Sequence, residues 1–283
     1  MNLETLQNTP PWDWPNDAAK VIEKILVDNG ANESDRLVAA GLAGDYTVIN
    51  DELATVLLTV LRDAGQPEQL RAKAAISFGA ALEEADLDEF DDPDSVPISE
   101  DMFHNIQKSL HVLYRDETNP KEVRRRVLEA SVRAPEKWHP DAIRTAYSSG
   151  DKEWVLTAVF SMQWVRGFDD QILEALESTD PLIRLEAVEA AGNWEIGAAW
   201  SHIAKLLKDP HTPKDLLIAA INASNIRPQE AREILEDLRD SDDEEIAEAA
   251  YEAMMMATAM ENPYEDSDDE EEGEEGNPPK WLH

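Results

Sequence analysis

Six histidines are the residues of this chain best suited to metal binding or proton transfer. Only two of them, seven positions apart, could share a helix face, and a metal site would also need carboxylates at set positions around them. The chain contains no cysteine, which excludes disulfides, thiolate catalysis and cysteine-based metal centres. We therefore predict no catalytic residue, no cofactor and no stoichiometric metal ion. The histidines are His104, His111, His139, His202, His211 and His283, and the pair is His104 and His111.

A short basic cluster and several tryptophans are the other candidates for binding. The cluster is the main local concentration of positive charge, and it is interrupted by Glu122 and Glu129. Trp154 and Trp164 are ten positions apart, on roughly opposite sides of a helix, so one of them is expected in the core. The cluster comprises Lys121, Arg124, Arg125, Arg126 and Arg133. The predicted partner-binding residues are Arg124, Arg125, Arg126, Trp154, Trp194 and Trp281.

The charge of the chain limits its partners. It has 61 acidic and 25 basic residues, a formal net charge of −36. Such a field repels phosphate backbones and anionic membranes over about a Debye length, roughly 8 Å. No stretch approaches the ~20 apolar residues of a membrane helix, and the first residues lack the pattern of a secretory signal. We expect a cytoplasmic protein that binds neither nucleic acid nor membranes, and whose partner is a protein with a basic surface.

The elements that must position these residues form a repeat. A unit of about 30 residues recurs, and each copy reads as two short helices, the second rich in alanine. Such a period predicts a solenoid. The units are aligned on an aspartate interpreted as ending the first helix, at Asp63, Asp116, Asp151, Asp180, Asp209 and Asp240, in steps of 53, 35, 29, 29 and 31 residues. About seven helix pairs are expected, beginning near Asn16, Asp51, Ser99, Trp138, Phe168, Ile196 and Pro228.

The alanine-rich second helices and two further features of the repeat carry a family resemblance. An Asp-Pro turn occurs at 180–181 and 209–210, and an arginine recurs in three second helices, at Arg71, Arg124 and Arg184. The segment from Asn16 to Met260 resembles HEAT repeats, in particular the short HEAT-like repeats named for phycobilisome lyases. The resemblance implies an all-α fold, an α-α superhelix in the form of a right-handed curved solenoid. Arg71, Arg184, Asp180 and Asp209 are interpreted as structural positions, the arginines tying neighbouring repeats through a turn aspartate or a backbone carbonyl.

Three segments fall outside this pattern. Residues 1–15 form an arm in which prolines disfavour helix, and Trp12 and Trp14 are expected to cap the first repeat. Residues 83–97 are an acidic insertion interpreted as a solvated loop. Its Asp86-x-Asp88 start resembles a calcium loop, but the glycine and glutamate that such a loop requires are missing. Residues 261–283 form an acidic tail predicted to be disordered.

The solenoid, residues 16–260, ends in a methionine run at Met254–Met256. We interpret this run as partly core and partly covered by the tail or by a partner. The tail itself ends in a tryptophan and a leucine that look like a tethered anchor. One hypothesis places Trp281 on the basic cluster of the same chain.

The resemblance leaves two functions open, because the family includes scaffolds, chaperones and a few enzymes. The favoured function is a non-catalytic adaptor or scaffold that binds a protein partner through the concave face of the solenoid. The alternative is a lyase or isomerase of the phycobilin-lyase type that acts on a chromophore or a partner protein. The deoxyhypusine hydroxylases of this family bind a di-iron centre through His-Glu dipeptides, and this chain has none. Colour or bound metal in the purified protein would favour the enzyme.

Overall fold

The computed structural model describes residues 2–88, 90 and 96–261, and every regular element in these residues is a helix. The prediction of an all-α fold is confirmed. None of the described helices combines the length and apolar composition needed to cross a membrane. The chain divides into two compact units, Met1–Trp194 and Glu195–His283.

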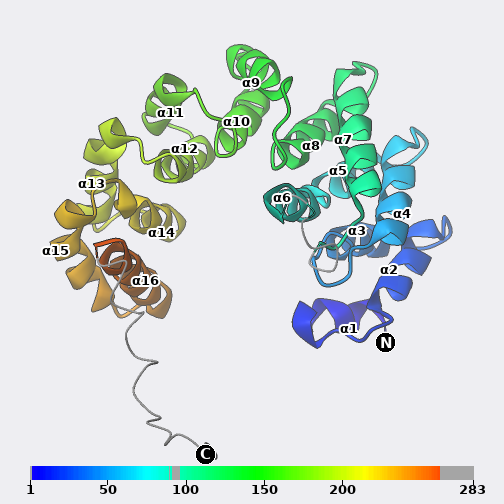
Figure 1. Ribbon diagram of the computed structural model, residues 1–283, viewed down its shortest axis with the longest axis horizontal. Helices are drawn as coiled ribbons and strands as arrows, with labels where there is room; N and C mark the ends of the chain where they lie inside the picture. The colour runs from blue at the N-terminus through cyan, green and yellow to red at the C-terminus, as the bar shows by residue number, and fades with distance from the viewer. Residues whose placement is uncertain (1, 89, 91–95, 262–283) are drawn as a thin grey trace, which may run out of the picture. The chain divides into compact units, whose positions relative to one another are not determined.

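The described residues contain seven successive helix pairs, as the repeat predicts (Figure 1). The pairs begin within about two residues of the predicted positions when the short 3₁₀ turn η2 (Gly197–Ala199) is counted with the sixth. In the first unit the pairs are α2 (Ala18–Val27) with α3 (Glu33–Leu42), α4 (Asp51–Arg62) with α5 (Glu68–Ile76), α7 (Glu100–Arg115) with α8 (Lys121–Ser131), α9 (His139–Ser148) with α10 (Lys152–Ser161), and α11 (Asp169–Leu176) with α12 (Pro181–Asn193). In the second unit they are α13 (Trp200–Lys208) with α14 (Lys214–Asn222), and α15 (Pro228–Arg239) with α16 (Glu244–Glu261).

In the first unit the second helices pack successively on one another. We call α3, α5, α8, α10 and α12 the second-helix row. The row lies along the inner side of this unit, and the first helices lie along its outer side (Figure 1). Buried alanines on the row, such as Ala74, Ala130 and Ala187, let neighbouring helix backbones approach closely. In the second unit α14 packs on α16 in the same way, with the 3₁₀ turn η3 (Ala223–Ile226) between α14 and α15.

The aspartates that were aligned as one repeat position occupy two positions. Asp63, Asp116 and Asp209 end a first helix, and the carboxylate of each accepts a hydrogen bond from the backbone N–H two residues later. Asp151 and Asp180 instead begin a second helix, where each carboxylate caps two backbone N–H groups. The alignment of Asp180 with Asp209 is therefore wrong, because both roles favour aspartate and the turn between them is short.

The N-terminal arm contains more helix than predicted. It forms α1 (Leu3–Gln7) and one 3₁₀ turn, η1 (Pro11–Asp13). The indole N–H of Trp14 donates to the carbonyls of Leu6 and Thr9, at 3.0 and 2.8 Å, and Trp14 packs against the core. Trp12 is 79% exposed, so the prediction that it covers the first repeat is wrong. Trp14 and the buried Leu6 form the cap instead.

The acidic insertion also begins as a helix. The segment α6 (Gly79–Asp88) packs on α7 and α8 and buries Leu82 and Ala85. The prediction of a solvated loop is therefore wrong for residues 83–88, because the two apolar residues fall on one helix face that can be covered. Residues 89 and 91–95 lie outside the described part, as does the acidic tail from residue 262 on, including Trp281.

Candidate functional site

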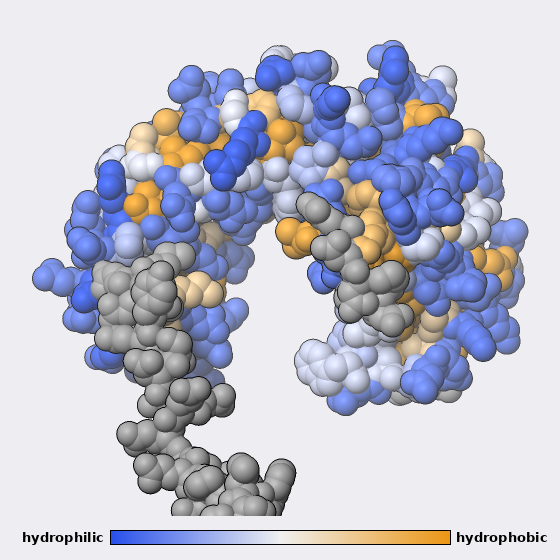
Figure 2. All heavy atoms as spheres, in the orientation of Figure 1, coloured by the Kyte–Doolittle hydropathy of each residue, from blue (hydrophilic) through white to orange (hydrophobic). Residues whose placement is uncertain are grey.

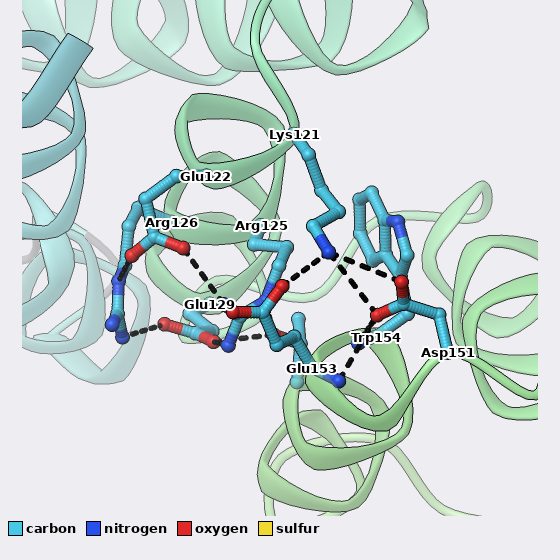
Figure 3. Close-up of polar contacts among 9 residues, drawn as sticks. Lys121, Glu122, Arg125, Arg126, Glu129, Asp151, Glu153 and Trp154 are labelled. Carbon is cyan, nitrogen blue, oxygen red and sulfur yellow. Dashed lines mark hydrogen bonds and ion pairs between the residues drawn. The ribbon is translucent and has the colours of Figure 1, made fainter.

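Lys121, Arg125 and Arg126 of the basic cluster lie in the second-helix row, where α8 packs on α10 (Figure 3). Arg125 and Glu129 are each only 4% exposed. Arg125 Nε donates to Thr157 Oγ1 at 2.9 Å, and its Nη1 atom donates to Glu122 Oε2 at 2.7 Å. Thr157 Oγ1 in turn donates to Glu129 Oε1 at 2.6 Å. These bonds join two helices of the row through a buried, hydrogen-bonded charge network.

Arg124 and Arg126 of the same cluster also form hydrogen bonds within the protein. Arg126 bonds to Glu122 at 2.8 Å and to Glu129 at 2.6 Å. Arg124 Nε donates to the carbonyl of Tyr114 at 2.8 Å. The interpretation of Arg124–Arg126 as an open basic docking patch is therefore revised. Arg125 is buried, and Arg125 and Arg126 are paired with carboxylates on the same helix, whereas Arg124 bonds to a backbone carbonyl.

The arginine that recurs in the second helices has a clear structural role in most copies. Arg71 and Arg124 each donate from Nε to a carbonyl ten residues earlier, on the first helix of their own pair. Arg36 makes the equivalent bond from its Nη2 atom to Leu26, and the sequence alignment missed it. Arg184 differs, because its Nε atom is buried without a hydrogen-bond partner among the described residues.

Arginines cover the tryptophans of the row. The guanidinium of Arg124 lies 5.6 Å from the ring centroids of both Tyr114 and Trp154. Arg133 lies 4.8 Å from the ring of Trp164. Trp154 and Trp164 are both partly exposed, so the prediction that one of them is core is wrong. An aromatic ring with a cation on its face tolerates a partly wet position.

Trp194 follows the same pattern at the end of α12. Arg166 lies 4.4 Å from its ring centroid, and its indole N–H donates to the carbonyl of Met162 at 2.6 Å. The tryptophan is partly exposed. Two partly exposed indoles, Trp164 and Trp194, therefore lie close to the turn that follows α10.

A second polar link repeats along the second helices. A lysine at the first position of one helix pairs with the aspartate that caps the next, at 3.1 Å between Lys121 and Asp151. Lys152 makes the same pair with Asp180. The hydrogen bond from Lys121 lowers the pKa of the Asp151 carboxyl below its usual range. In the second unit Lys214 pairs with Asp243 at 2.8 Å.

A pair of glutamates that the sequence did not single out lies on α12. Gln163 Nε2 donates to Glu186 Oε2 at 2.7 Å and to Glu189 Oε2 at 3.0 Å. Both glutamates are half-buried. Burial, together with the nearby charges of Glu189 and Glu129, raises the pKa of Glu186 to about 7, and burial also raises the pKa of Glu189. No described basic side chain forms an ion pair with either carboxylate.

The raised pKa of Glu186 makes stability pH-dependent. A carboxyl whose pKa is higher in the folded protein binds its proton more tightly there, so its contribution declines as pH rises from about 4.5 to about 7. We expect Glu186→Gln to match the wild type near pH 4.5. At pH 8 it should be more stable by about 1–2 kcal/mol, once solvent screening is allowed for. Urea unfolding at both pH values measures this.

The control for this prediction is Glu233→Gln, which removes the same charge from an exposed position on α15. It should change stability by less than about 0.5 kcal/mol at either pH. An equal gain from both variants at pH 8 would show that general charge repulsion, and not burial of Glu186, is responsible.

Two of the described histidines, His111 and His139, pack against the Trp138 ring. His139 is fully buried, and its ring contacts the backbone N–H of Glu136 and the Ser131 hydroxyl. Burial, with a smaller contribution from His111, lowers its pKa to about 3, so the ring is neutral. His111 stacks on Trp138, with ring centroids 4.7 Å apart. In the described part of the chain, no three His, Asp or Glu side chains are arranged to hold a metal ion.

Comparisons with known proteins concern the fold. No protein-family model and no curated protein matches the chain. Among solved structures it is similar to YibA from Escherichia coli, with 17% identity and a TM-score of 0.44 over 89% of this chain and 85% of that one. It is also similar to human deoxyhypusine hydroxylase in complex with glycerol, with 17% identity and a TM-score of 0.40 over 90% and 88%. Membership of a particular HEAT-like family stays a prediction.

Proposed function

We propose that this protein is a non-catalytic adaptor that binds a protein with a basic surface through its second-helix row. The observation that carries the proposal is the pair Glu186 and Glu189. The two carboxylates are half-buried and lack a basic partner among the described residues, whereas Arg125 and Arg126 are already paired with other carboxylates. A lysine or arginine from a partner would supply the missing charge.

Apolar contacts are available next to these carboxylates. Gln163 bonds to both glutamates, the adjacent Met162 carbonyl accepts the Trp194 indole, and Trp164 follows in the chain. Partly exposed tryptophans are the residues most often responsible for binding energy at protein interfaces. Hydrophilic residues cover most of the visible face of each unit (Figure 2), and the net charge of −36 would accelerate the approach of a basic partner.

The proposal predicts that partner binding depends on two named carboxylates. The double variant Glu186→Gln with Glu189→Gln should weaken partner affinity about 10- to 100-fold, because each of the two lost charge pairs at this half-buried site is worth roughly 0.7–1.4 kcal/mol. Affinity capture with wild-type and variant baits identifies the partners that are lost. Titration calorimetry with the purified partner then gives the affinities.

A matched control has the same net charge as the double variant but changes two exposed glutamates instead. Glu233 and Glu236 are exposed on α15, and changing both to glutamine removes the same two charges. This control should leave affinity within about twofold. Wild-type affinity should also fall as salt rises from about 50 to 300 mM. Equal loss in both double variants would contradict a site at Glu186 and Glu189, and affinity insensitive to salt would contradict a basic partner.

A further inference from the structure

The two ends of the repeat array are covered to different extents. At the N-terminal end, α1 and Trp14 lie against α2 and α3, and Leu6 is fully buried. At the other end, α16 packs on α14 and α15, but among its described side chains only Ala250 is buried. In solenoids, an exposed apolar face on a terminal helix pair is usually covered by a capping segment.

The uncovered part of α16 borders a groove in the second unit. The groove has a volume of about 370 Å³ and is formed by the end of α14, η3, the start of α15 and the face of α16 that carries Met256. Met256 is 66% exposed, and two neighbours on α16, Tyr251 and Met255, are each 54% exposed. A flexible methionine beside a groove of this size can adapt to a bulky apolar side chain. Its lining residues are Asn222, Ser224, Asn225, Pro228, Glu252, Ala253, Met256 and Ala257.

The sequence after α16 supplies such a side chain. A Pro-Pro-Lys-Trp-Leu segment occurs at 278–282. Between α16 and Trp281 the chain is dominated by acidic residues, so apart from Tyr264, which closely follows α16, Trp281 and Leu282 are the large apolar residues of this segment. Lys280 would complement Glu252, which lines the groove.

The intervening chain is long enough for this contact. Nineteen residues, 262–280, separate Glu261 from Trp281. A flexible chain of that length has a root-mean-square span of about 25 Å, and charge repulsion extends it. Met256 lies only about 8 Å along the helix from Glu261. A flexible tether of this length would give Trp281 an effective concentration at the groove on the order of millimolar.

We propose that Trp281 occupies the groove between η3 and α16 of its own chain and caps the last helix pair, as Trp14 caps the first. Lys280 then faces Glu252, and the Pro278-Pro279 step directs the chain into the groove. The proposed contact lies within the second unit and is independent of partner binding at Glu186 and Glu189.

Disulfide trapping tests this contact in the full chain, which has no native cysteine. The test pair is Met256→Cys with Leu282→Cys. The matched control is Met255→Cys with Leu282→Cys, because Met255 is its neighbour, is similarly exposed and does not line the groove. In a glutathione redox buffer, the test pair should form an intramolecular disulfide about three- to tenfold more readily than the control pair.

Dependence on Trp281 completes the test. Adding Trp281→Ala should remove the advantage of the test pair, whereas Trp12→Ala, which removes an exposed tryptophan after two prolines, should not. Equal trapping of both pairs would overturn the proposal, because it would reflect the tether alone. Disulfides that join two chains on a non-reducing gel would also overturn it and would identify a second copy as the occupant.

Discussion

Replacement of Arg125 by alanine is expected to lower the free energy of unfolding by about 3 kcal/mol. The side chain is buried, and it bonds to Glu122 on its own helix, α8, and to Thr157 on α10. Its removal leaves Glu129, also buried, with fewer compensating charges, and creates a void where the arginine stem packed. Glu129 keeps Arg126 and Thr157 as partners. We therefore expect a loss of unfolding free energy at the lower end of the range for buried ion pairs that lose one partner.

The measurement is urea unfolding followed by circular dichroism, with hydrogen exchange of the α8 and α10 amides to locate the loss. Arg144→Ala is the matched control, because Arg144 pairs with Asp141 at 2.8 Å but its side chain is 60% exposed. The control should cost less than about 0.5 kcal/mol. If the two variants were equally stable, the network around Arg125 would not join the two helices.

The helix pairs could be predicted because their signals are local. Asp-Pro turns, proline at the start of a helix and alanine-rich second helices recur at a fixed period, and each depends on a few adjacent residues. The aspartate alignment is wrong because it also uses only local signals. An aspartate that ends one helix and an aspartate that caps the next are a few residues apart and chemically identical, so the pattern alone does not separate them.

The candidate site could not be predicted from the sequence, because it is defined by contacts between residues that are far apart in the chain. Three consecutive arginines point in three directions around a helix, and only the position of α10 shows that Arg125 is the buried one. Glu186 and Glu189 are two of 61 acidic residues, and they stand out only because Gln163, more than 20 residues away, bonds to both. The ten-residue spacing between Arg36 and Leu26 was the one signal that could have extended the arginine pattern.

A glycine in the second-helix row should give the second large effect. Gly44 follows α3 and lies against the end of α5, where the Ser77 hydroxyl donates to the carbonyl of Ala40 at 2.7 Å. A Cβ atom added at Gly44 would lie 2.3 Å from the Ser77 carbonyl oxygen and 2.8 Å from its Cα. Both contacts are with backbone, so they cannot be relieved by rotating a side chain. The helices must separate, and the buried Ser77 hydrogen bond must lengthen.

Gly44→Ala is therefore expected to lower the free energy of unfolding by about 2–3 kcal/mol, the cost of overpacking a close helix contact. Gly65→Ala is the matched control, because its added Cβ would meet the side chain of Asp63, with its Oδ1 atom nearest at 3.1 Å, and no backbone atom. The control should stay within about 1 kcal/mol of the wild type, since alanine also reduces the entropy of the unfolded chain. Urea unfolding compares the two. Similar stability of both variants would mean that α3 and α5 can separate freely, and that the second-helix row is held by its polar links and not by close backbone packing.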